Sequence, residues 1–169
     1  MQVTTKILYF SSSRFPLAAV AGALHIGLLS REGMQNRFSL RDLHFLNLKD
    51  NFEGQITALG NDTFNNDIYV LSIKEDSDMI MRLVESFLRL NGLPAGSLLL
   101  VDCGVGDNWW LLAGIIFNKF SLTKKLGSVL ICAGINKHYE TLVELTNRVK
   151  DSLAKSLDSD LEFLDNGLR

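Results

Sequence analysis

The sequence has few cysteines, few prolines and no long hydrophobic run. Its 169 residues include two cysteines and two prolines. Cys103 and Cys132 each lie at the end of an apolar stretch, which is typical of a reducing compartment and argues against a disulfide framework. The most apolar stretch, Trp109 to Phe120, is too short and too interrupted to span a bilayer. The first residues lack the apolar core and cleavage site of a signal peptide, so we expect a soluble cytoplasmic protein.

Charge of either sign is also modest. The chain has 17 basic and 19 acidic side chains and a formal net charge of −2, so we expect neither nucleic acid nor an anionic membrane as a partner. A hydrophobic fraction of 47% is typical of a compact globular protein. The length is that of one domain.

The common signatures of nucleotide, metal and hydrolase sites are missing. The chain has neither the glycines and Lys-Ser/Thr pair of a Walker loop nor a G-x-G-x-x-G run. No histidine pair has metal-ligand spacing, and C-x-x-C and G-x-S-x-G are absent. We therefore expect no cofactor and no metal. His25 and Cys103 are interpreted as a hydrogen-bonded histidine of the core or a groove and a small buried hydrophobe.

The chain does contain a strand, a polar loop and an apolar helix between Lys6 and Leu29. Ile7 to Phe10 is a short apolar run typical of a strand buried on both faces. Pro16 suits the first turn of a helix extending to Leu29, whose many small residues allow close approach to a sheet. The loop's backbone N–H groups then lie at a helix N-terminus, where anions bind readily.

Strands and helices alternate through the rest of the chain. Strands are predicted in 52–74, as a hairpin or a pair joined by a longer loop, and at 97–103 and 128–133. Helices are predicted at 76–91, 107–122 and 134–157, with a short one capped by Ser39. The helix at 76–91 has Asp76 or Ser77 as its cap and an apolar stripe of Ile80, Leu83, Val84, Phe87 and Leu88.

This alternation predicts an α/β fold: a three-layer α/β/α sandwich, Rossmann-like, with a mostly parallel sheet of about five strands. An antiparallel strand or hairpin is expected at one edge. Residues 1–150 are predicted to form a single domain, and 151–169 a helical extension or tail.

In such a sheet, ligands bind at the carboxyl ends of the strands. The loops expected there are 11–14, 74–77, 102–107 and 133–138. The candidate ligand-binding residues are Ser11, Ser12, Ser13, Arg14, Asp102 and Lys137. Hydroxyls, backbone donors and a guanidinium suit a phosphate, sulfate or carboxylate. The alternative is a serine-rich turn with a solvated arginine, Asp102 as a cap or turn residue, and Lys137 at a solvated helix start.

Two apolar features indicate an interaction surface. Trp109 and Trp110 cannot both face one side of a helix, so one is expected to pack on the sheet and the other to be exposed or in an interface. A stripe at helical spacing continues into the acidic tail, where it either packs on the body or docks on another copy. Its members are Leu142, Leu145, Val149, Leu153, Leu157, Leu161 and Leu164.

Four segments, ILYF…AAVAGALHIGLL, NDIYVLSIK, LLLVD and INKHYETLVELTNRVK, together resemble an uncharacterised bacterial family, catalogued as domain of unknown function 3189. The likeness covers most of 6–150, and its most distinctive parts are 25–28, Lys137, Tyr139 and 142–145. In that family the loop after the first strand is similar to a turn with glycine and histidine that ends in serines. Here residues 11–16 have neither glycine nor histidine, which implies a site altered or lost if that loop is the family's site. The resemblance implies no established activity.

Two functions fit these observations. The first is a small-ligand or anion-binding α/β protein that uses residues 11–14 with Asp102 and Lys137. The second is a non-catalytic interaction or homo-oligomerisation protein that uses the Trp109-Trp110 helix and the C-terminal leucine stripe. The pattern favours the first slightly and leaves open whether the protein is an enzyme.

Overall fold

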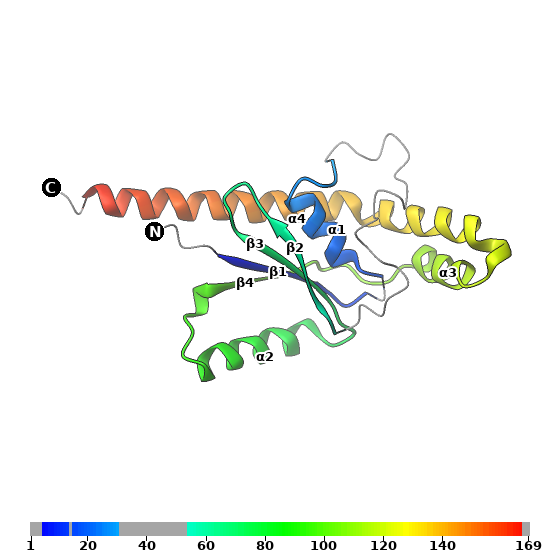
Figure 1. Ribbon diagram of the computed structural model, residues 1–169, viewed down its shortest axis with the longest axis horizontal. Helices are drawn as coiled ribbons and strands as arrows, with labels where there is room; N and C mark the ends of the chain where they lie inside the picture. The colour runs from blue at the N-terminus through cyan, green and yellow to red at the C-terminus, as the bar shows by residue number, and fades with distance from the viewer. Residues whose placement is uncertain (1–4, 14, 31–53, 167–169) are drawn as a thin grey trace.

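The computed structural model describes residues 5–13, 15–30 and 54–166, with backbone alone for Ala95 and 156–166. Figure 1 shows the arrangement of the elements. In chain order they are β1 (Lys6–Ser11), α1 (Leu17–His25), β2 (Ile56–Asn61), β3 (Asp67–Ser72), α2 (Ser77–Leu90), η2 (Ala95–Ser97), β4 (Leu98–Asp102), α3 (Trp109–Asn118), η3 (Ser121–Thr123) and α4 (Lys124–Asn166). Arg14 and the short helix predicted after Ser39 lie outside the described residues.

The sheet has the order β2-β3-β1-β4, with β1 in its interior. β1 runs parallel to both neighbours, with Lys6 opposite Asp67 on β3 and Leu98 on β4. β2 pairs antiparallel with β3, which confirms the predicted antiparallel strand at one edge. Within the described residues the sheet has four strands, so it is smaller and less parallel than the predicted sheet of about five.

The strand predicted at 128–133 is wrong, and so is the loop predicted at 133–138, because both segments lie inside α4. Gly127, Ile131 and Gly134 are spaced by four and three residues, so they share one face of a helix. That face packs against α3 very closely: a Cβ on Gly127 would lie 2.6 Å from the Asn118 backbone nitrogen. The glycines therefore serve helix packing and do not mark the ends of a strand.

The side chains of β1 point alternately to the two sides of the sheet. Ile7 and Tyr9 belong to the larger hydrophobic cluster, which includes residues of α1, α3 and α4. Leu8 and Phe10 belong to the smaller cluster, which includes Ile80 of α2. In Figure 1, α1 and α4 accordingly lie on one side of the sheet and α2 on the other. The burial of β1 on both faces is as predicted.

α1 begins at Leu17, one residue after the predicted start at Pro16, and ends at His25, before the predicted end at Leu29. Gly27, with a φ of +77°, takes the left-handed conformation that ends many helices. Against the sheet α1 packs tightly, since a Cβ on Gly22 would lie 2.6 Å from Leu59 Cδ1. The small residues of this helix are therefore required for contact with β2 and β3.

α2 has the predicted ends but a more exposed surface than predicted. The Asp76 carboxylate caps it by accepting a hydrogen bond from the Asp78 amide at 3.2 Å. Ile80 and Leu88 are buried, whereas Leu83 and Phe87 are 67% and 61% exposed. Two of the five residues of the predicted stripe thus face away from the sheet.

α4 is a single helix of 43 residues, or about 65 Å at 1.5 Å per residue. Its first part pairs with α3 in a helical hairpin that projects from the sheet (Figure 1). Farther along, Leu142, Leu145, Val149 and Leu153 pack into the larger cluster, so this part of the predicted stripe packs on the body. No helix in the described part of the chain is long and apolar enough to cross a membrane.

Candidate functional site

Two serines, one at the end of β1 and one in the loop after it, accept backbone hydrogen bonds at the start of α1, Ser11 from the first turn of the helix and Ser13 from the residue before Pro16. Ser11 Oγ accepts a hydrogen bond from the Ala18 amide at 3.3 Å, and Ser13 Oγ accepts one from the Phe15 amide at 3.1 Å. Both serines are buried, while Ser12 is exposed. Serine oxygens thus occupy amide positions near this helix N-terminus that would otherwise be open to an anion.

The loop after β4 lies against the loop after β1. Asp107 Oδ1 accepts a hydrogen bond from Ser13 Oγ–H at 2.5 Å, which joins segments 94 residues apart. Asp102 Oδ1 accepts one from the Gly104 amide at 2.9 Å. Gly104 has a φ of +60°, so Asp102 stabilises a turn that needs glycine. Sequence reasoning predicted that these loops would meet but did not single out Asp107.

α4 contributes Lys137 and His138 near the same edge. Lys137 is exposed and His138 is half-buried. Burial and then the charge of Lys137 lower the pKa of His138, against a hydrogen bond with the Gly106 backbone. His138 Nε2 is shielded from solvent and has no hydrogen-bond partner, which is unusual for a buried polar atom. The histidine signal was present in the sequence, although the helix containing it begins ten residues earlier than predicted.

The carboxyl edge therefore combines a free hydroxyl on Ser12, the Lys137 ammonium and a neutral imidazole. These groups can hydrogen-bond a small polar ligand, but the neighbouring Asp107 carboxylate repels an anion. Within the described residues no group of three His, Cys, Asp or Glu side chains is placed to hold a metal. Burial, with Asp102 nearby, raises the pKa of the Cys103 thiol, which confirms Cys103 as a buried hydrophobe and makes it a poor nucleophile.

A second polar cluster is sealed inside the fold. His25 Nδ1 lies 2.6 Å from Tyr9 Oη, and His25 Nε2 lies 3.2 Å from Asp62 Oδ2. The side chains of His25 and Asp62 are 0% and 1% exposed. Burial lowers the pKa of His25 more than its bond to Asp62 raises it. The imidazole is then neutral, accepting from Tyr9 O–H and donating to Asp62.

This Tyr9–His25–Asp62 cluster joins the end of α1 to the β2–β3 turn. Burial, with smaller contributions from Cys103 and Asp62, raises the pKa of Tyr9, so the phenol stays protonated. Because the cluster has no access to solvent, it serves the structure and carries no substrate chemistry. The predicted interpretation of His25 is confirmed, whereas Asp62 was missed because it lies in a run of turn-forming residues.

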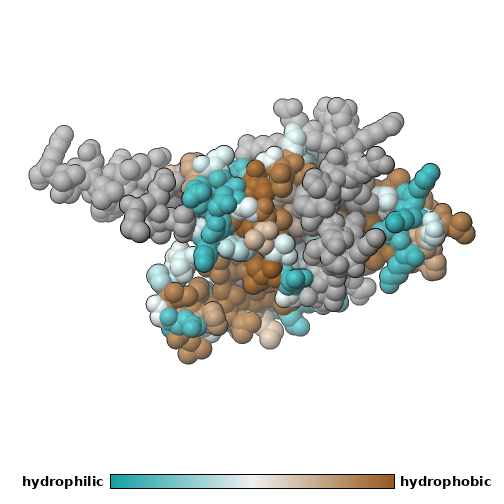
Figure 2. Space-filling view, viewed as in Figure 1, coloured by the Kyte–Doolittle hydropathy of each residue, from teal (hydrophilic) through white to brown (hydrophobic). Residues whose placement is uncertain are grey.

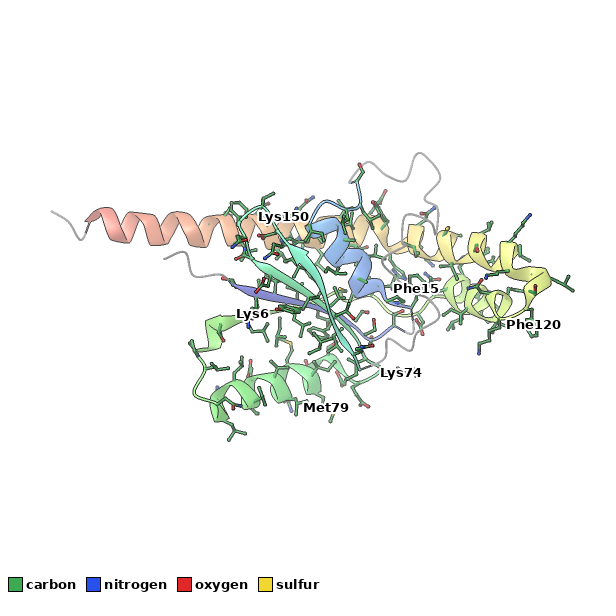
Figure 3. The ribbon with its side chains drawn as sticks, in the orientation of Figure 1. Lys6, Phe15, Lys74, Met79, Phe120 and Lys150 are labelled. Atoms are coloured by element: carbon green, nitrogen blue, oxygen red, sulfur yellow. The ribbon has the colours of Figure 1, made fainter. Side chains whose placement is uncertain are left out.

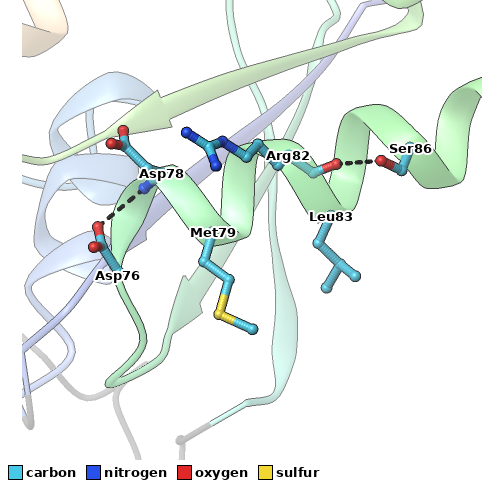
Figure 4. Close-up of a pocket in the computed structure, with 6 residues that line it drawn as sticks. All are labelled: Asp76, Asp78, Met79, Arg82, Leu83 and Ser86. Atoms are coloured by element: carbon cyan, nitrogen blue, oxygen red, sulfur yellow. Dashed lines mark hydrogen bonds between the residues drawn. The ribbon is translucent and has the colours of Figure 1, made fainter.

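A groove of about 450 Å³ lies on the outer side of α2 (Figure 4). All of its lining residues come from this helix and its cap, and none belongs to the carboxyl edge. They are Asp76, Asp78, Met79, Arg82, Leu83 and Ser86. Met79 and Leu83 lie on the same exposed side of α2 as Phe87. The groove is therefore part of the exposed apolar surface of this helix.

The α3–α4 hairpin carries the largest group of exposed apolar side chains. These eight, here called the hairpin surface, are Trp109, Trp110, Ile116, Phe117, Phe120, Leu122, Leu126 and Val129, exposed by 37% to 100%. Figure 3 shows Phe120 at the end of the hairpin far from the sheet, and in Figure 2 hydrophobic residues lie beside hydrophilic ones there.

The expectation that one tryptophan packs on the sheet is wrong, since Trp109 and Trp110 are 78% and 48% exposed. α3 packs on α4, not on the sheet, and turns Leu111 and Gly114 toward α4. The tryptophans lie in the first turn of α3, on the face that points away from α4. No described element packs against that face.

Comparison with known proteins agrees with the resemblance in the sequence. A family model described as a protein of unknown function, DUF3189, matches residues 6–151. No curated protein and no solved structure matches the chain. Since the family model covers most of the sequence, the chain belongs to the DUF3189 family.

Proposed function

We propose that this protein is a non-catalytic interaction protein that binds a macromolecular partner through the hairpin surface. One observation carries the proposal: eight large apolar side chains are exposed together on a hairpin that projects from the fold. Soluble monomers rarely expose large contiguous apolar patches, and those that do commonly use them to bind. Aromatic residues are also the side chains most enriched in the cores of protein interfaces.

The contacts at the carboxyl edge weigh against the anion-binding alternative. The hydroxyl oxygens of Ser11 and Ser13 already accept hydrogen bonds from the Ala18 and Phe15 amides, and the Ser13 hydroxyl donates one to Asp107. An incoming phosphate would have to replace these bonds and approach a carboxylate. The hairpin surface, by contrast, needs no rearrangement to bind.

Site-directed crosslinking in cells tests the interaction. The photoreactive residue p-benzoylphenylalanine replaces Ile116 on the hairpin surface or, as a control, Leu83 on α2; these positions are 57% and 67% exposed. We expect an ultraviolet-dependent product of discrete mass from position 116 and none from position 83. Equal labelling, or no product from position 116, would contradict the proposal.

A second candidate is supported by the unpartnered Nε2 atom of His138. In this alternative the fold follows the Rossmann-like rule, and a small polar ligand binds at the carboxyl ends of β1 and β4. The ligand would bond to Ser12, Lys137 and His138, with the imidazole as its acceptor.

Thermal shift measurements with inorganic phosphate, which near pH 7 keeps an O–H that it can donate to the imidazole, test this candidate. Its expected result is a rise in Tm that Lys137→Ala abolishes and Lys155→Ala preserves, since both lysines are exposed on α4 and only Lys137 is near the edge. A rise that persists in Lys137→Ala would count against this site.

A further inference from the structure

The outer face of α3 is apolar throughout. At 100° per residue, positions 109, 110, 113, 116 and 117 share one side of the helix. The four large side chains there are exposed: Trp109 by 78%, Ile116 by 57%, Trp110 by 48% and Phe117 by 37%. No residue from Trp109 to Asn118 is charged. This face is therefore a continuous strip without a polar residue.

α3 cannot rotate to hide this strip, because its other face is tightly fixed to α4. A Cβ on Gly114 would lie 2.9 Å from the Gly127 carbonyl oxygen, and one on Gly134 would lie 2.9 Å from the Leu111 amide nitrogen. The Asn108 side chain also accepts from the Leu111 amide and donates to the Gly134 carbonyl. The orientation of α3 is thus set by backbone contacts, and among the described residues nothing covers the strip.

The exposed area is that of one side of a stable protein interface. With ~150–250 Å² for each aromatic side chain and somewhat less for each aliphatic one, the exposed fractions of the four strip residues, Phe120 and Leu122 amount to roughly 750 Å². Leu126 and Val129 are left out, because they lie on sides of α4 that point away from α3. A standard interface buries about 800 Å² on each partner. The largest apolar patch of a typical monomer is about 300–600 Å².

We propose that a second copy of the chain covers the strip and the hairpin end at Phe120 and Leu122, with α3 packed against α3 of its partner about a two-fold axis. The inference rests on the proposed interaction function and names its partner. Two such hairpins form a layer of four helices in which the two α3 helices pack on each other and both α4 helices lie outside. A two-fold axis brings identical faces together, which favours a face without charge.

The charged residues of the hairpin remain exposed to water in this arrangement. No acidic residue occurs between Asn108 and Tyr139, while four lysines do, namely Lys119, Lys124, Lys125 and Lys137. Lys119 follows the last residue of α3, and the other three lie on α4. None lies on the strip, so the pairing of two copies does not bury like charges. The same lysines make an anionic lipid surface the competing partner.

Light scattering with size-exclusion chromatography is the test. The wild-type chain should have twice the monomer mass of 18.9 kDa. Ile116→Glu, which puts a charge in the centre of the strip at an exposed position, should halve that mass without changing the circular dichroism spectrum. Leu83→Glu, on an exposed position of α2, should leave the dimer intact.

Tryptophan fluorescence gives a second readout, since both tryptophans of the chain lie on the strip. Their emission should shift to shorter wavelength as the protein is concentrated through the dimer transition, and Ile116→Glu should not show the shift.

Two results would overturn the dimer: a monomeric wild-type chain, or a dimer that Ile116→Glu does not dissociate. A monomer whose emission shifts on addition of phosphatidylglycerol vesicles would assign the hairpin surface to a membrane. A monomer that crosslinks from position 116 to another protein would assign it to that protein. In both cases the interaction function stands and the second copy is wrong, whereas a monomer without vesicle binding or crosslink contradicts both.

Discussion

Asp62→Ala is the substitution that most directly measures the polar cluster in the core. The Asp62 carboxylate accepts four hydrogen bonds. Its donors are the Phe64 amide, the Asn66 amide, the Asn66 side chain and His25 Nε2, at 2.8 to 3.2 Å. Its side chain is 1% exposed. Alanine would remove all four acceptor contacts at once.

The free energy lost with each hydrogen bond depends on whether water can reach the donor that remains. Phe64 is exposed, so water can replace the oxygen at its amide, whereas Asn66 and His25 are 6% and 1% exposed. Leaving a buried hydrogen-bond donor without its acceptor costs about 1–3 kcal/mol, and Asp62→Ala leaves such donors on both Asn66 and the neutral His25. We therefore expect a loss of about 3 kcal/mol, and a fall in Tm of about 6–12 °C for a chain of this length.

Equilibrium urea unfolding at neutral pH measures this loss, with Asp67→Ala as the matched control. Asp67 begins β3 in the same hairpin, and its carboxylate accepts an exposed hydrogen bond from Asn61 at 2.9 Å. Asp67→Ala should therefore change the free energy of unfolding by less than about 1 kcal/mol. If the two variants were equally stable, the buried cluster would not contribute to the free energy of unfolding.

Three further results are expected. Gly127→Ala should destabilise the fold by about 1–3 kcal/mol, because its Cβ would meet backbone atoms of Asn118, whereas Gly96→Ala, with open space around it, should not; thermal melts compare the two. The pKa of His25 is lowered by burial, so below about pH 6.5 the unfolded chain binds a proton at this residue before the folded chain does, and the free energy of unfolding decreases as the pH is lowered. His25→Gln should reduce this pH dependence in urea unfolding. Burial raises the pKa of the Cys103 thiol, so iodoacetamide at pH 8 should label it, by mass spectrometry, only after unfolding.

Local sequence signals were sufficient where an element buries a simple pattern. The apolar run at 7–10 predicted β1, and Asp76 with Asn91-Gly92 predicted both ends of α2. The helix caps depend on residues close in sequence, which is why they can be read directly. Burial depends on tertiary packing, and here the pattern failed: Leu83 and Phe87 fit the stripe of α2 but have no partner in the described structure.

The part of α4 that was predicted as a strand does have helical spacing in its sequence, but a short apolar run between glycines favoured a strand. The run at 129–132 is apolar and lies between two glycines, which favours a strand. Yet Gly127, Ile131, Gly134 and Ile135 also follow the three-four spacing of a helix, and that spacing continues to Leu142. A short apolar run fits both periods. The longer period decides the assignment, because the glycines are buried against α3.

The sequence predicted where the candidate site lies in the fold but not how its side chains are arranged. Alternating strands and helices predicted that the loops after β1 and β4 would meet, and the bond from Ser13 to Asp107 shows that they do. No sequence pattern indicated that the hydroxyls of Ser11 and Ser13 would face inward to accept from the Ala18 and Phe15 amides. Nor could it indicate that α3 would pack on α4 with both tryptophans turned outward, since this depends on Gly127 and Gly134, which lie 17 to 25 residues farther along the chain.

The position of β1 inside the sheet also determines when the protein can fold during its synthesis. β1 is made first, but Lys6 pairs with Asp67 and Leu98, so its hydrogen-bonding edges wait for about 60 and then 90 residues of chain. α1, made next, packs on α4, the last helix. Such distant pairings slow folding and expose apolar segments in the meantime. The nascent chain therefore holds its most buried strand and helix unpaired until α4 has been made, and a chain released before α4 would have its α1 cluster open to water.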